Sequence, residues 1–291
     1  MAAADASSVA VAAGPRFHSV LSLARSSLDI VIPSATLMSI VFACFCLPAL
    51  TSLPSPVAGR VLESNLPLFS PGHFLGTDLN GNDSLSRLVH GGRVSIQIAF
   101  AVNLIGLVLG GTVGALSGYL GRFVDALIMR VLDVFIAFPS LVLVLAVAQG
   151  GGGGIANTIW SLSLFSVPAF ARVARAATLR IREQPFVDAA VLSGAGAGRI
   201  VFRHLVPNIA PQLIIFGLLG IGIVIVIEGG LSFLGFGVQA PQPSWGNMIA
   251  QGQQLFLSNP SLVLLPSGML FLVVLSCNLL GDALRTRWNI A

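Results

Sequence analysis

The chain has 291 residues, of which 55% are hydrophobic and only 9% are charged, and its mean hydropathy is +0.91. Ordinary soluble domains carry roughly 25% charged residues, so this composition excludes a water-soluble globular protein and predicts a membrane protein. All fifteen basic residues are arginine. A Walker A loop and a Schiff-base enzyme both need a lysine. The chain is therefore expected neither to contain a Walker A loop nor to act through a Schiff base.

Six apolar stretches are long enough to cross a hydrocarbon core of roughly 30 Å as helices. They cover residues 30–50, 94–118, 127–147, 155–174, 212–231 and 262–280. They predict an all-α membrane protein with six transmembrane helices in one domain, residues 29–291. Residues 1–28 are rich in alanine and serine and are predicted to form a flexible cytoplasmic tail.

The arginines indicate how the chain is oriented in the membrane. An even number of spans places both termini on one side, and twelve of the fifteen arginines lie on that side in a six-span arrangement. By the positive-inside rule, this imbalance predicts a multi-pass protein of the cytoplasmic (inner) membrane with both termini in the cytoplasm. The segment 185–207, between the fourth and fifth spans, then also faces the cytoplasm.

The second span carries a glycine at every fourth position, which forms one stripe along a helix. These residues are Gly106, Gly110, Gly114 and Gly118. The stripe predicts a face where another helix approaches to backbone contact. The alternative is a flexible hinge.

The segment 185–207 is rich in alanine and glycine. Pro185 is expected to begin a short helix, residues 194–198 to break it, and a second turn, 199–205, to end before Pro207. Such an elbow, with small residues on its surface, could lie against another protein. The alternative is an amphipathic connector on the lipid headgroups, but residues 194–198 offer little apolar surface to bury.

The same segment resembles the cytoplasmic coupling motif of ABC-importer permeases, in which an E-A-A triplet is followed at fixed spacing by glycine and proline. The matching residues are Asp188, Ala189, Ala190, Gly194 and Pro207. Aspartate replaces the usual glutamate, which keeps the charge but shortens its reach. "RHLVPN", residues 203–208, is similar to the version found in the dipeptide, oligopeptide and nickel branch.

Three further stretches resemble the same branch. They are "LGTDLNGNDSLSRLVHGGRVS" at 75–95, "IMRVLD" at 128–133 followed by "AFPSL", and "EGGLSFLGFGVQAPQPSWGNMI" at 228–249. Four matching segments in the same order are highly specific. The chain is therefore similar to the second, C-type permease subunit of the peptide-importing branch.

That resemblance implies a type I ABC-importer permease fold and an ATP-dependent uptake system. The partners would be a second permease subunit in a heterodimer, ATPase subunits that hold ATP and magnesium, an extracytoplasmic substrate-binding protein and membrane lipid, with no nucleic acid. The permease itself would have no catalytic site and no bound cofactor. Peptides are the expected solute, and nickel or another small solute is the alternative. Residues expected to dock the ATPase or shape the elbow are Asp188, Ala189, Ala190, Gly194, Arg199, His204 and Pro207.

Two acidic residues, Asp133 and Glu228, lie within predicted spans. Charged groups at membrane depth are costly and usually face a bundle interior or a cavity, which makes both candidates for the translocation pathway. The alternative is an intramembrane ion pair or a position at a helix end. Both residues lie in the matched motifs, which do not assign their role.

Other functional classes have weaker support. His73 and His90 are predicted outside and His18 and His204 inside, so no metal site is expected. Ser117 lies in "GALSG", which misses the G-x-S-x-G pattern of a serine hydrolase, and no histidine lies within the spans to serve it. A secondary transporter would be expected to show an inverted repeat, and none is evident.

The stretch Asp78-Leu79-Asn80-Gly81-Asn82 superficially resembles the start of a calcium loop. The match fails because the sixth position of the loop is Asp83 instead of glycine and the twelfth is Val89 instead of glutamate. Asp78 and Asp83 are interpreted as turn and N-cap acids that precede a helix at 84–89.

Overall fold

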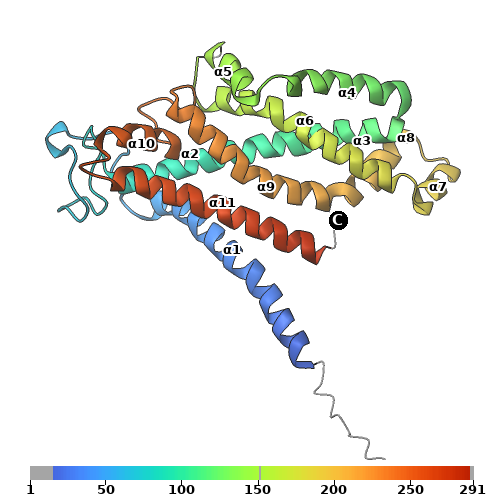
Figure 1. The fold of residues 1–291 in the computed structure, drawn as a ribbon, viewed down its shortest axis with the longest axis horizontal. Helices are drawn as coiled ribbons and strands as arrows, with labels where there is room; N and C mark the ends of the chain where they lie inside the picture. The colour runs from blue at the N-terminus through green and yellow to red at the C-terminus, as the bar shows by residue number, and fades with distance from the viewer. Residues whose placement is uncertain (1–15, 151, 289–291) are drawn as a thin grey trace, which may run out of the picture.

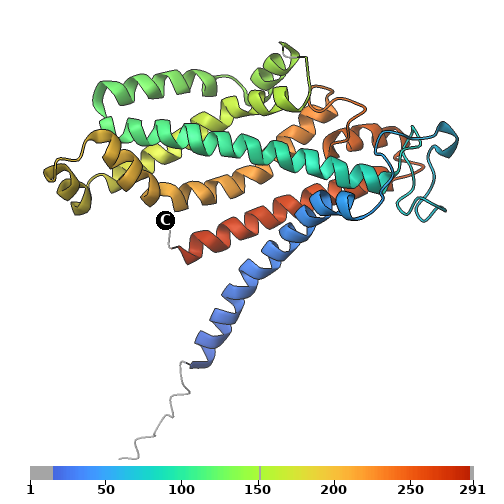
Figure 2. The ribbon, with the colours of Figure 1, turned by 180° about the vertical axis from the view of Figure 1, so that it is seen from behind.

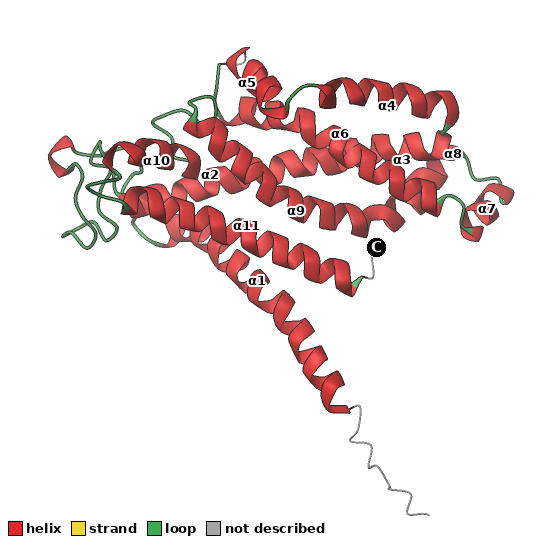
Figure 3. Ribbon diagram, in the orientation of Figure 1, coloured by secondary structure: helices red, strands yellow, loops and turns green. Residues whose placement is uncertain are grey.

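The computed structural model describes residues 16–150 and 152–288, and Figure 3 shows that these ranges are mostly helical, with long loops gathered at one end. The α-helices are α1 Arg16–Leu50, α2 Ser84–Ile105, α3 Gly111–Leu120, α4 Arg122–Ala137, α5 Ser140–Gly150, α6 Ile155–Ile181, α7 Pro185–Leu192, α8 Ala197–Arg199, α9 Val206–Phe233, α10 Trp245–Gly252 and α11 Ser261–Arg287. Shorter segments are the 3₁₀-helices η1 Val61–Glu63 and η4 Gln253–Leu255, and the π-helices η2 Gly106–Gly110 and η3 Ile200–Leu205. The described ranges contain only isolated β-bridges and no strand, which confirms the all-α prediction.

The long helices α2, α3, α6, α9 and α11 form an elongated bundle with two distinct ends (Figure 1). At one end, called here the cap end, α10 lies beside the loops of residues 51–83. At the other end, called the elbow end, α7 and α8 project from the bundle, and Figure 2 shows the same arrangement from behind. Helix α1 packs on α11 and α2 near the cap end and diverges from the bundle toward its own N-terminus.

Two clusters of buried apolar side chains hold the bundle together. The larger cluster, toward the cap end, includes Ile98, Ile225, Leu231 and Trp245, all fully buried. The second joins α3, α6 and α9 to the elbow. The elbow is therefore fixed to the bundle by its own core.

Four helical segments in the described ranges are long and apolar enough to cross a membrane. They are Leu28–Leu50, Ser84–Leu120, Ala197–Phe233 and Ser261–Arg287, and counting the bent pair α4 and α5 as one span gives five. The predicted span at 155–174 forms a helix within α6 but is not among these candidates. Its buried face carries hydroxyl side chains that hydrogen-bond within the bundle, such as Ser166 Oγ to the carbonyl oxygen of Val102 at 3.1 Å.

The predicted third span, 127–147, is not one continuous helix. Helix α4 ends at Ala137, and the chain bends by 87° between α4 and the next helical segment, Leu141–Gly150. Pro139 causes the break, because it disfavours helical geometry in the residue before it, and Phe138 has extended dihedral angles of φ −83° and ψ 141°. The prediction of a straight span was wrong at this proline.

The N-terminal tail also differs from the prediction. Helix α1 begins at Arg16, so residues 16–28, assigned to a flexible tail, are helical. The rest of the predicted tail, residues 1–15, lies outside the described residues.

Candidate functional site

The elbow, residues 185–207, begins with a helix whose start is encoded locally. Gln184 is the N-cap residue of α7 and Pro185 occupies the first helical turn, where its missing N–H costs no hydrogen bond. Asp188 lies in the same turn, where a negative charge complements the positive end of the helix dipole. The predicted helix start at Pro185 is confirmed.

The end of α7 depends on Gly194. The N–H of Gly194 donates to the carbonyl oxygen of Val191 at 2.9 Å, and the N–H of Ala195 donates to that of Ala190 at 3.1 Å. This pair of bonds is the Schellman arrangement, which requires a left-handed residue after the helix. Gly194 has φ +79°, a conformation that side chains with a β-carbon rarely adopt. Because no atom lies within 4 Å of a β-carbon placed there, backbone conformation rather than space calls for glycine.

Buried side chains attach the elbow to the bundle. Val187, Ile200, Val201 and Leu205 are each at most 2% exposed and belong to the cluster that contains Phe170 of α6. Burying such side chains contributes about 1.5–3 kcal/mol each. These side chains join α7 and η3 to α6 and α9 in one packed cluster.

The opposite surface of the elbow is uncovered. Phe186, Val191 and Leu192 are exposed large apolar residues, and Leu192 is 88% exposed. Asp188 and Ala189 are exposed beside them, whereas Ala190 is partly buried. The elbow thus presents small and apolar side chains around one carboxylate.

The remaining predicted elbow residues lie beyond Gly194 and do not form a separate turn. Arg199 ends α8, and His204 lies in the π-helix η3, which continues directly into α9. Pro207 lies in the first turn of α9, where a proline is tolerated. The predicted end of the helix before Pro207 was therefore wrong, because the wider turn of η3 precedes the proline and the chain remains helical.

The glycine stripe of the second span lies against α6. A β-carbon on Gly110 would lie 2.8 Å from Cβ of Phe170, one on Gly114 would lie 2.8 Å from Cα of Ala171, and one on Gly118 would lie 2.9 Å from Cβ of Thr178. Gly106 faces Ser166 and Phe170 in the same way. Contacts of this kind leave no room for any side chain larger than hydrogen. The stripe includes the π-helix η2, so the contact continues from α2 through α3.

Asp133 and Glu228 have different environments. Asp133 of α4 is half exposed and accepts a hydrogen bond from Arg172 Nη2 of α6 at 2.6 Å. Glu228 of α9 is fully buried within this chain and accepts hydrogen bonds from Ser95 Oγ at 2.9 Å and Ser232 Oγ at 2.7 Å. The ion-pair alternative therefore describes Asp133 and does not describe Glu228.

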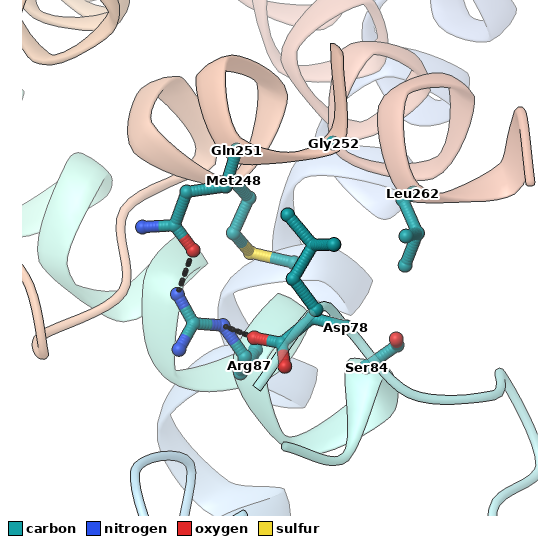
Figure 4. Close-up of a pocket in the computed structure, with 8 residues that line it drawn as sticks. Asp78, Ser84, Arg87, Met248, Gln251, Gly252 and Leu262 are labelled. Carbon is teal, nitrogen blue, oxygen red and sulfur yellow. Dashed lines mark hydrogen bonds and ion pairs between the residues drawn. The ribbon is translucent and has the colours of Figure 1, made fainter. Parts of the chain in front are cut away.

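At the cap end, Arg87 connects three segments that lie far apart in sequence. Its Nε lies 3.2 Å from Oδ2 of Asp78, and its Nη2 donates to Oε1 of Gln251 at 3.0 Å (Figure 4). Its Nη1 also donates to the carbonyl oxygen of Pro56 at 3.3 Å. Arg87 is only 3% exposed, and the residues around it enclose a cavity of about 20 Å³. No role for this arginine is predicted from the sequence, although it lies in one of the matched motifs.

Asp78 and Asp83 organise the loop before α2. Oδ1 of Asp78 accepts the N–H groups of Asn80 and Asn82, and Oδ1 of Asp83 accepts that of Ser86 at 2.7 Å. Asp83 is the N-cap of α2, which confirms the interpretation of both residues as turn and N-cap acids. Within the described ranges, no three histidine, cysteine or acidic residues are grouped to hold a metal ion.

The loop before α2 also contains a histidine held between two acids. Nδ1 of His73 lies 2.8 Å from Oδ2 of Asp83, and its Nε2 lies 3.4 Å from Oε2 of Glu63. The hydrogen bond to Asp83 and the nearby Glu63 raise the pKa of His73 above its ordinary value of 6.5, against the opposing effect of burial.

We expect the stability of this loop to depend on pH. Because the folded-state pKa of His73 is raised, its contribution is fully present below about pH 6.5 and is lost as the pH rises through the folded-state value. Hydrogen-exchange protection of residues 59–83, corrected for intrinsic rates, should be higher at pH 6 than at pH 8. The variant His73→Gln should remove this difference, and an unchanged pH dependence in that variant would contradict the assignment.

The chain is similar in sequence to permeases of known transport systems. Residues 110–289 match the family described as binding-protein-dependent transport system inner membrane component. The chain is 39% identical over 213 residues to the dipeptide transport system permease protein DppC of Alkalihalophilus pseudofirmus, which covers 73% of this chain and 70% of that protein. It is also 39% identical over 216 residues to the glutathione transport system permease protein GsiD of Pectobacterium atrosepticum, which covers 74% and 72% of the two chains.

The fold is similar to that of a solved transporter. A structure of inward-facing conformations of the MetNI methionine ABC transporter matches 68% of this chain and 95% of its own, with a TM-score of 0.56 and 20% sequence identity. Because residues 110–289 match the family and the related permeases are 39% identical, this chain belongs to the family of inner membrane components of binding-protein-dependent transport systems. It is a multi-pass inner-membrane transport component rather than an enzyme, and the resemblance found in its motifs is confirmed.

Proposed function

We propose that this chain is one of two permease subunits that form the pathway of an ATP-dependent peptide importer. The observation that carries the proposal is the 39% identity, over about three quarters of the chain, to permeases named for dipeptide and glutathione. Glutathione is itself a short peptide. These names favour peptides over nickel as the transported solute.

The elbow supports a role in coupling transport to ATP hydrolysis. Its exposed face combines the small residues Ala189 and Gly194 with the apolar side chains of Val191 and Leu192. Exposed apolar patches of this kind are typical of protein interaction sites. In the proposed assembly this face occupies a groove on an ATPase subunit, and movement of α7 is transmitted through Val187 and Leu205 to the bundle.

ATP and magnesium belong to the ATPase subunits in this proposal. The chain has no lysine for a Walker A loop, and we assign it no cofactor and no catalytic residue. An extracytoplasmic binding protein delivers the peptide at the cap end, and a second permease subunit completes the pathway. Asp133, which is half exposed on α4, stays a candidate for the lining of that pathway.

The proposed topology has six membrane crossings. The four continuous candidates and the bent pair α4 and α5 supply five, and α6 supplies the sixth inside the bundle. Both termini and the elbow end are placed in the cytoplasm. The arginines of the second half of α6, which leads to the elbow, follow the positive-inside rule in this orientation.

The proposal predicts ATP-driven uptake of peptides. We would reconstitute the assembled transporter with its second permease, ATPase subunits and binding protein, and measure accumulation of labelled dialanine, trialanine, a hexapeptide and nickel. Accumulation of one or more peptides only in the presence of ATP is expected. Accumulation of nickel without peptide, or peptide accumulation by this chain alone driven by an ion gradient, would contradict it.

A further inference from the structure

Helix α10 is inserted into the cap end of the bundle. Trp245 is fully buried, Gly246 lies so close to α9 that a β-carbon on it would be 2.5 Å from Cα of Gly229, and Met248 is also buried. Trp245 Nε1 donates to the carbonyl oxygen of Leu88 of α2 at 2.9 Å. This short helix therefore packs against α2, α9 and α11, at the end of the bundle where Figure 1 shows it.

Glu228 holds the beginning of this insertion through two serines. The N–H of Trp245 donates to Ser95 Oγ at 3.3 Å, and the N–H of Val238 donates to Ser232 Oγ at 3.0 Å. Each serine in turn donates its hydroxyl hydrogen to a different oxygen of the Glu228 carboxyl group. Both carboxyl oxygens of Glu228 therefore act as acceptors in this arrangement. Glu228 thus binds the chain on both sides of the turn that precedes α10.

Arg87 holds the other end of α10. Its guanidinium donates to Gln251 in the last turn of the helix and is itself held by Asp78. The charge of Arg87 lies near the last turn of α10, where a cation complements the helix dipole. Glu228 and Arg87, at most 3% exposed, lie at the two ends of α10.

We propose that Glu228 and Arg87 are positioning residues that clamp α10 as a plug, and that this plug closes the transport pathway at the cap end. The second part of this inference rests on the proposed transport function. The first part concerns only the chain itself. Glu228 accordingly acts through α10 and does not contact the transported solute.

The clamp is tested by hydrogen exchange of the assembled transporter in lipid nanodiscs. Glu228→Gln keeps the side-chain volume but replaces one acceptor oxygen by an amide NH2 group, so the hydroxyl hydrogen of one serine loses its acceptor. Removing one partner of a buried hydrogen bond costs about 1–3 kcal/mol, which corresponds to exchange about 5- to 150-fold faster. We expect this increase at residues 238–248 and no change in α11. Ser95→Ala removes a hydrogen bond of the same Glu228–Ser95–Trp245 chain. The double variant Ser95→Ala/Glu228→Gln should therefore increase exchange, in free-energy terms, by less than the sum of the two single variants.

Asp282→Asn is the matched control, because it removes an exposed carboxyl group of α11 and should leave exchange at 238–248 unchanged. Arg87→Gln should increase exchange at the Gln251 end of α10. Ser95→Ala and Ser232→Ala are smaller changes that test the clamp if Glu228→Gln does not fold. Unchanged exchange at 238–248 in these serine variants would overturn the clamp.

The closing role is tested by leakage. Proteoliposomes that contain the assembled transporter are loaded with labelled dialanine, and its release is followed without ATP. We expect faster release from Glu228→Gln than from the wild type or Asp282→Asn. Faster exchange without faster release would overturn the plug while leaving the clamp. Failure of the proposed function is distinguishable, because it would show as absent ATP-driven uptake by the wild type.

Discussion

Replacing Gly194 by tryptophan is expected to abolish peptide uptake by the assembled transporter while membrane insertion of the chain remains normal. Gly194 has φ +79° and lies on the exposed face of the elbow. A residue with a β-carbon in this conformation is strained by about 1–2 kcal/mol, and the indole would also project where the ATPase is proposed to bind. ATP hydrolysis should then proceed without transport. Uptake and hydrolysis by the same reconstituted transporter measure the two effects.

Three further variants separate backbone strain from steric obstruction. Asparagine tolerates the left-handed conformation better than valine does, so Gly194→Asn should retain more uptake than Gly194→Val. Both side chains are smaller than tryptophan, so this comparison reports mainly on backbone strain. Gly198→Val introduces the same side chain in helix α8, where the glycine has open space and no positive φ. Normal uptake by Gly194→Trp would remove the docking role assigned to this face.

Replacing Gly114 by leucine is expected to have the largest effect on stability. A β-carbon at this position would lie 2.8 Å from both Cα and the carbonyl carbon of Ala171, and backbone atoms cannot turn aside as a side chain can. The two helices must separate, and overpacking of this kind typically costs about 1–3 kcal/mol or more. The midpoint of thermal unfolding in detergent should fall clearly, and the yield of folded protein should fall with it.

Gly268→Leu is the control for Gly114→Leu. Gly268 lies in α11 with no atom within 4 Å of an added β-carbon, so the same substitution should be nearly neutral there. Equal loss of stability in both variants would show that leucine in an apolar helix, and not the contact with Ala171, causes the effect.

Local chemistry made several features of the site predictable. Pro185 begins α7, Asp83 caps α2, and the residues of the elbow motif could be located because their order along the chain is itself the signal. Helix breaks were harder to predict. Hydropathy alone did not reveal the bend before Pro139, because the apolar run continues across it. It also did not reveal that η3 continues into α9 through Pro207.

The sequence by itself determined that the chain is an all-helical membrane protein, and its ordered motifs identified the permease family. These properties follow from composition, from the length of apolar runs and from short-range spacing. Only the tertiary structure decided which groups Glu228 and Arg87 contact. Their partners Ser95 and Gln251 lie 133 and 164 positions away along the chain, and no periodic pattern relates residues at such separations. The packing of α2, α9 and α10 against one another brings these residues together. The buried N–H of Trp245 at the start of α10 needs a hydrogen-bond partner away from water, and Ser95 supplies it.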